Sequence, residues 1–245
     1  MSTTSYTTLW DTIHWKSIPG MPKAHPDATT DRVTLPPLPG WIMVLSKESL
    51  EGAAFRSGAA LAHLRLAAGQ ALVPQALWRD RLALAAAEVC TGRPEGVHDI
   101  RDAVHRLRPG DHPGPAGMIF QHWLRALARP ISVAHRGTAL AGVSAEQIAL
   151  CLESAGATPV DRAAAVLESV LADAPRAETA ARILACALLS KAMGRDHLLP
   201  CLALALKPRD LRLRDKDLRL ACHRAVAAGA GQAVALAADL ARRAA

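Results

Sequence analysis

Helix start and stop signals recur along the chain after residue 40. Thr158-Pro159 is an N-cap residue followed by proline at the first helical position, and Ser144 precedes Gln147 by three residues, as in a capping box. Gly92 is placed to end a helix. We expect about nine or ten helices, at residues 46–69 (capped by Ser46), 74–90, 95–107, 115 or 117 to 128, 144–156, 158–173, 175–194, 196–206, 215–228 and 231–243.

Alanine and leucine supply most of the apolar content of this sequence. Apolar residues make up 51% of the chain, but aromatic residues only 3%. Ala and Leu lose little side-chain freedom in a helix, whereas sheets are enriched in β-branched and aromatic residues. The loops between the expected helices are short. The sequence therefore predicts an all-α fold in which residues 41–245 form a single compact multi-helix domain.

Residues 1–40 differ from the rest of the chain. Ser, Thr and Pro dominate this segment, which ends in LPPLPG and shows no helical period. It also carries Trp10, Ile13 and Trp15, and exposed indole rings are poorly tolerated. We therefore expect an extended, partly docked N-terminal arm. If the arm docks on a neighbouring subunit, the protein is a homo-oligomer.

The cysteines suggest a reducing compartment. Five of them are dispersed among the expected helices: Cys90, Cys151, Cys186, Cys201 and Cys222. None forms a CxxC pair, so we expect buried thiols rather than a zinc ribbon or disulfides. No apolar run reaches the roughly 18 residues that a membrane span needs, and the N-terminus lacks the features of a signal peptide. A cytoplasmic protein without membrane contact is expected.

The segment from residue 97 to 123 combines histidines and aspartates with a loop rich in proline and glycine. His98, Asp102 and His105 share one face of the expected helix because they are spaced i, i+4 and i+7. The full set of candidate metal ligands is His98, Asp102, His105, Asp111, His112 and His122. Such a set could hold a divalent metal with an open water position, although it matches no HExxH signature. In the other interpretation these residues form surface ion pairs and turn caps, and no cofactor is expected.

Arginine-rich stretches are candidate anion contacts. The net charge is +7, and guanidinium groups bind phosphate in a bidentate fork. The candidate contacts to an anion or a nucleic acid are Arg101, Arg106, Arg108, Lys207, Arg209, Arg212, Arg214 and Arg219. The last five lie in KPRDLRLRDKDLR, which is either a basic rim or a solvated charged connector. No aromatic residue is interleaved there, so base stacking is not expected.

Several strings of this chain resemble a family of bacterial proteins. They are WRDRLAL, the GRPE link, IRDA and RPGDHPGPAG, with weaker similarity through LLPCLALAL and the final AVALAADLARRA. The family is catalogued as domain of unknown function 1403, and the resemblance covers Pro37 to the C-terminus. His112 stands where the family is expected to have an acidic residue. The resemblance supports the helical fold and the cytoplasmic compartment, and it implies no activity.

Two functions remain open from the sequence. The first is a non-enzymatic binding module that engages a protein or nucleic-acid partner through its arginine-rich surface. The alternative is a metal-dependent or acid/base hydrolase that uses the His/Asp cluster at 98–122. No glycine-rich phosphate loop and no GxSxG motif nominates a catalytic residue.

Overall fold

The regular secondary structure of the described part of the chain consists of helices. The computed structural model describes residues 35–43, 49–92, 100, 112–132, 143–153 and 157–244. Within these residues there are eight α-helices, one 3-10 helix (η1) and no strand, which confirms the all-α fold with slightly fewer helices than expected. The elements are α1 (Gly40–Met43), α2 (Leu50–Ala68), α3 (Gln75–Thr91), α5 (Gly114–Ala128), α7 (Ala145–Glu153), α8 (Pro159–Asp173), α9 (Glu178–Ala192), η1 (Pro208–Arg212) and α10 (Asp215–Ala244).

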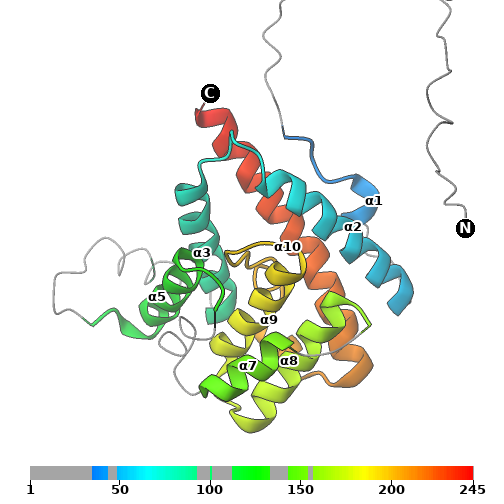
Figure 1. The fold of residues 1–245 in the computed structure, drawn as a ribbon, viewed down its shortest axis with the longest axis vertical. Coiled ribbons are helices and arrows are strands. Elements are labelled where there is room, and N and C mark those ends of the chain that lie inside the picture. Colours follow the sequence, from blue (N-terminus) through cyan, green and yellow to red (C-terminus); the bar gives the residue numbers. More distant parts are fainter. Residues whose placement is uncertain are drawn as a thin grey trace, which may run out of the picture. The chain divides into compact units, whose positions relative to one another are not determined.

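The long C-terminal helix α10 is the element against which most of the others pack. It has 30 residues, which corresponds to a length of about 45 Å. It lies beside α2 over much of its length and also contacts α1, α3, α8 and η1 (Figure 1). Its buried positions are mainly alanine, valine and glycine, and these small side chains let the neighbouring helix axes come close.

The expectation of two helices at 215–228 and 231–243 was wrong. Gly229 and Gly231 lie inside the continuous helix α10, where the absence of a side chain lets neighbouring segments pack close to the helix backbone. A Cβ atom at Gly229 would overlap the carbonyl oxygen of Cys201 and come within 3.2 Å of the Leu204 side chain. At Gly231 it would come within 3.0 Å of the Met43 sulfur. Glycine is needed here for close packing rather than for a helix end.

The expected helix at 196–206 was also wrong, since the structure has turns in this stretch. Its residues from Leu198 to Leu204 are all buried. The backbone amide of Leu199 donates to the Ser190 hydroxyl (2.8 Å) instead of to a helical carbonyl. A continuous apolar run has no polar face, so its periodicity cannot distinguish a helix from another buried conformation.

Helix α9 is enclosed by the rest of the structure. Every residue from Ala180 to Ser190 is buried, as expected for a helix that is apolar on all sides. The exceptions to its apolar character are Ser190 and Arg182, whose guanidinium lies 3.5 Å from the carboxylate of Glu178 one turn earlier. The helix therefore forms the centre of the packing with α8, α7 and α5.

The local start signals of two helices are confirmed. The Thr158 hydroxyl accepts a hydrogen bond from the first turn of α8, and Pro159 occupies the first helical position. The Ser144 hydroxyl accepts from the amide of Gln147 (3.1 Å) at the start of α7. The Gln147 side chain does not complete the capping box but donates to Asp173 at the end of α8 (2.6 Å). This contact ties the two helices together.

The start of α2 differs from the expectation. The helix begins at Leu50 and is capped by the Ser49 hydroxyl, which accepts from the amide of Gly52 (3.2 Å). The predicted cap, Ser46, lies outside the described residues. The predicted end at Gly69 is confirmed.

Other expectations fall on parts of the chain that the structure does not describe. These are most of the arm at residues 1–40, with its possible contact to a neighbouring subunit, and the helix at 95–107. The boundary near residue 40 also stays a prediction. Of the helices that are described, none is both long and apolar enough to cross a bilayer.

All five cysteines are buried and none is in a disulfide, as expected. Burial disfavours the thiolate, so it raises the pKa of Cys201 to about 12 and that of Cys186 well above its ordinary value. These thiols fill space in the core as small apolar groups.

We predict that replacing Gly229 by alanine lowers the free energy of unfolding by about 3 kcal/mol, because the new Cβ meets backbone that cannot move independently. The matched control is Gly58→Ala in α2, where a Cβ meets nothing within 4 Å. That variant should gain about 0.5–1 kcal/mol from its better helix propensity. Urea denaturation measures both, and equal stability of the two variants would contradict the close approach at Gly229.

We predict that Ellman's reagent at pH 8 does not react with the folded protein and reacts with all five thiols after unfolding. The reason is that reaction needs an accessible thiolate, and every cysteine is buried. Rapid reaction of any thiol under native conditions would contradict the packing described above.

Candidate functional site

Most of the predicted histidine and aspartate cluster lies outside the described residues. This holds for His98, Asp102, His105 and Asp111. Of the two that are described, His112 accepts a hydrogen bond at Nδ1 from the amide of Gly114 (3.2 Å), just before α5. His122 is partly buried on α5, and this burial, together with Arg125, lowers its pKa. Among the described residues no group of three or more His, Cys, Asp or Glu side chains is arranged to hold a metal ion, so the metal site stays a prediction.

The second group of predicted contacts surrounds the short helix η1. Arg101, Arg106 and Arg108 lie outside the described residues, and the remaining five are described. The Asp210 carboxylate accepts from the amide of Lys207 (2.9 Å), and the amide of Asp210 donates back to the Lys207 carbonyl (3.0 Å). Leu211 is buried beneath this turn. The backbone of the segment is therefore a turn fixed to the core, and the choice between a basic rim and a solvated charged connector stays a prediction.

Three of these basic residues line one open hollow beside η1. We call it the η1 hollow; it has a volume of about 940 Å³ and lies between the end of α3, η1 and α10. Its basic side chains are Lys207, Arg209 and Arg212. The other residues that form its wall are Glu88, Val89, Thr91, Gly92, Leu204, Ala205, Pro208 and Gln232.

A second hollow borders the same turn. It has a volume of about 510 Å³ and shares Lys207 and Arg209 with the η1 hollow. Arg224 of α10 adds a further basic side chain there, while Asp210 and Asp217 add carboxylates. Since cations and carboxylates are nearly balanced in it, the η1 hollow is the stronger candidate for an anion.

The described charges in the η1 hollow favour an anionic ligand. Its three cations face one carboxylate, that of Glu88. The guanidinium of Arg209 approaches the Asp210 carboxylate only to 3.7 Å, and its side chain is 77% exposed, so water screens this ion pair. The guanidinium can therefore still donate hydrogen bonds to a bound anion. No aromatic ring is among the described residues that line the hollow. Such a site suits phosphate or carboxylate oxygens better than a stacked base.

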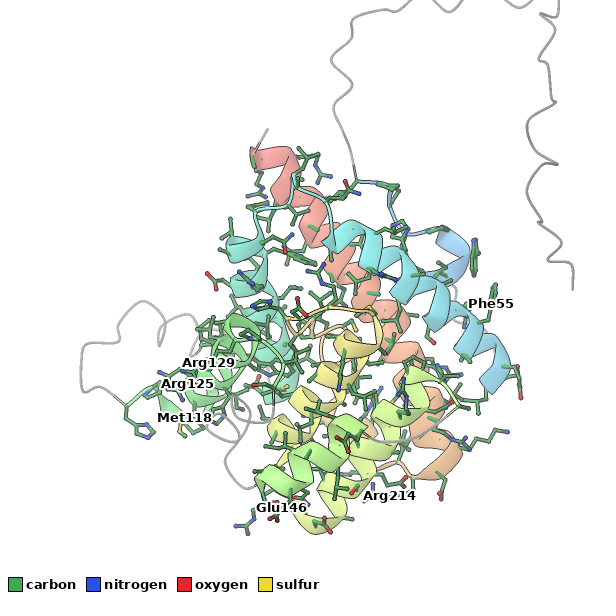
Figure 2. The ribbon with its side chains drawn as sticks, in the orientation of Figure 1. Phe55, Met118, Arg125, Arg129, Glu146 and Arg214 are labelled. Atoms are coloured by element: carbon green, nitrogen blue, oxygen red, sulfur yellow. The ribbon has the colours of Figure 1, made fainter. Side chains whose placement is uncertain are left out.

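The other two predicted contacts lie elsewhere. Arg214 donates from Nη1 to the carbonyl oxygens of Leu211 (3.0 Å) and Leu213 (2.8 Å), so its side chain closes the turn before α10 (Figure 2). Arg219 is exposed on α10 and lines neither hollow. Of the basic residues of this stretch, Lys207, Arg209 and Arg212 thus line the hollow, whereas Arg214 supports the backbone.

The wall opposite the cations was not identified from the sequence. Gly92 ends α3 in the left-handed conformation (φ 65°), and a Cβ there would lie 3.1 Å from Cγ of Pro208. Gln232 comes from the middle of α10. Gly92 is more than 100 positions from both Pro208 and Gln232 along the chain, so no local pattern could have joined them, although Gly92 is predicted as a helix end.

We predict that Gly92→Ala lowers the free energy of unfolding by about 1–2 kcal/mol, because alanine is strained at a positive φ and the new methyl presses on Pro208. Gly69→Ala is the control, since this helix end has φ −84° and its nearest atoms would be at 3.6 Å. The control should stay within about 0.5 kcal/mol of the wild type. Denaturant titration of both variants checks this, and similar losses would contradict the assigned contact.

Comparison with known proteins adds a family but no activity. A family model described as Protein of unknown function (DUF1403) matches residues 26–245. Searches of curated proteins and of solved structures found no match. The family expected from RPGDHPGPAG and its neighbouring strings is thus confirmed.

Proposed function

Because this chain belongs to the DUF1403 family of proteins of unknown function, we propose its function from its own surface: it binds the phosphate backbone of a nucleic acid at the η1 hollow. The observation that carries the proposal is the grouping of Lys207, Arg209 and Arg212 around one open hollow, where Glu88 is the single carboxylate among the lining residues that the structure describes. Guanidinium and ammonium groups arranged in this way attract phosphate oxygens.

The form of the hollow supports a backbone ligand over a stacked base. Since aromatic rings are lacking among its described lining residues, bases would not stack there. The contacts would be electrostatic and independent of nucleotide sequence. The net charge of +7 would add long-range attraction for a polyanion.

The rigidity of the turn also supports this function. The Asp210 carboxylate accepts a hydrogen bond from the backbone amide of Lys207, and the buried side chain of Leu211 anchors the turn in the core. The backbone that carries the cations is therefore ordered before a ligand binds, which reduces the entropic cost of binding. An acidic protein segment is the competing ligand, and the experiment below includes it.

We predict that the full chain binds a short fluorescent DNA duplex of mixed sequence, with an affinity that falls steeply as salt is added. The double variant Arg209→Gln/Arg212→Gln should weaken binding about tenfold or more. It should also reduce the slope of log affinity against log salt by about 2, because two phosphate contacts are lost. Fluorescence anisotropy measures both quantities.

The matched control is Arg242→Gln/Arg243→Gln, which removes two exposed arginines from the end of α10. These residues lie about 15 Å beyond Gln232 along the helix, so binding should change little. Equal loss in both variants would mean that net charge alone drives binding. Tighter binding of an acidic peptide than of DNA would overturn the choice of nucleic acid.

A further inference from the structure

Three helices bring a serine, a histidine and an aspartate together inside the structure. Ser57 comes from α2, Asp161 from the first turn of α8 and His223 from α10. The Ser57 Oγ lies 2.7 Å from Nδ1 of His223, and Nε2 of the same ring lies 3.5 Å from the carboxylate of Asp161. Both Ser57 and His223 are 1% exposed.

The serine and the histidine lie in the wall of a cavity of about 340 Å³. This volume is at the lower end of the range for small-molecule sites. The remainder of its described lining is mostly apolar, with Ala54, Leu61, Ala62 and Met193, and Arg65 is its one permanently charged side chain. The cavity therefore suits a compound with a short acyl chain.

We propose that this cavity is the active site of an esterase for small acyl esters, with Ser57 as the nucleophile, His223 as the general base and Asp161 as the group that orients the histidine. Nucleophilic catalysis needs a hydroxyl within hydrogen-bond reach of a base that a third group orients. Ser57 and His223 meet the first condition, and the Asp161 carboxylate, 3.5 Å from Nε2, would orient the ring by electrostatic attraction rather than by an ordinary hydrogen bond. The site is separate from the η1 hollow and does not depend on the binding function.

The position of Asp161 favours the histidine tautomer that this chemistry requires. A carboxylate beside Nε2 favours the proton on that nitrogen, which leaves Nδ1 free to accept from Ser57. The carboxylate is itself held in place, because its Oδ2 accepts from the hydroxyl of Thr158 (2.8 Å). The Ser57 hydroxyl also lies 3.0 Å from the carbonyl of Ala54, which is the competing acceptor for its proton.

The reaction proceeds in two balanced steps. Ser57 Oγ attacks the carbonyl carbon of the ester while its proton passes to Nδ1 of His223. The ester C–O bond breaks, and the histidine returns that proton to the departing alkoxide, which leaves as an alcohol. Water then attacks the acylated serine with His223 again as the base, and releases a carboxylic acid and free Ser57.

The start of α8 supplies a place for the charge that develops on the carbonyl oxygen. The N-cap residue Thr158 and the first two helical residues, Pro159 and Val160, line the cavity. Amides in the first turn of a helix have no acceptor within it, and the helix dipole is positive at this end. The backbone N–H of Val160 is thus the candidate donor to the oxyanion.

The test uses the full chain with a fluorophosphonate probe and with 4-nitrophenyl butyrate. We expect a phosphonyl adduct that peptide mass spectrometry locates on Ser57. The Ser57→Ala variant should lose the adduct and at least about 100-fold of the butyrate turnover, since the nucleophile is then missing. His63→Ala, a matched change on the same helix outside the cavity, should keep the full rate.

A second variant keeps the test decisive if Ser57→Ala does not fold. Gly58→Leu places a side chain at the cavity where a Cβ meets nothing within 4 Å, so it should fold and still lose turnover. The proposal is overturned if folded wild-type protein carries no adduct on Ser57, or if either folded variant hydrolyses the ester at the wild-type rate. The serine and histidine would then only connect α2 with α10.

Discussion

The close approach of the 198–206 segment to α10 is the contact on which the rest of the structure depends. The carbonyl of Cys201 lies where a side chain at position 229 would stand, so the two backbones meet directly. This contact lets an irregular apolar segment fill the centre of the molecule. The irregular segment ends at Lys207, directly before η1, so its packing against α10 also sets the position of the η1 hollow.

Hydrogen bonds from polar side chains fix the relative positions of segments that pack through small apolar residues. An alanine-rich interface has few large side chains that interlock, so a hydrogen bond between elements adds specificity there. The indole N–H of Trp78 on α3 donates to the carbonyl of Ala233 on α10 (3.1 Å). The Ser190 hydroxyl of α9 accepts a hydrogen bond from the backbone amide of Leu199. The first bond joins helices 155 positions apart in sequence, and the second fixes the segment that follows α9, nine positions along the chain.

Helix α10 contributes to both proposed sites from different positions along its length. Gln232 borders the η1 hollow and His223 lines the cavity beside α2. Nine residues of α-helix correspond to about 13 Å and to about half a turn beyond two full turns, so the two side chains leave opposite sides of the helix. The two proposed sites can therefore lie on one rigid element without overlap between them.

The sequence by itself determined the helical class, the family and the ends of helices such as α8, because caps, proline at the first turn and terminal glycines act through near neighbours. The tertiary structure alone decided that Gly229 continues a helix and that residues 196–206 form none, because backbone contact overrides local signals there. It also decided the meeting of Ser57 with His223, which are 166 positions apart. Spacing along a chain carries no information about partners that only packing brings together.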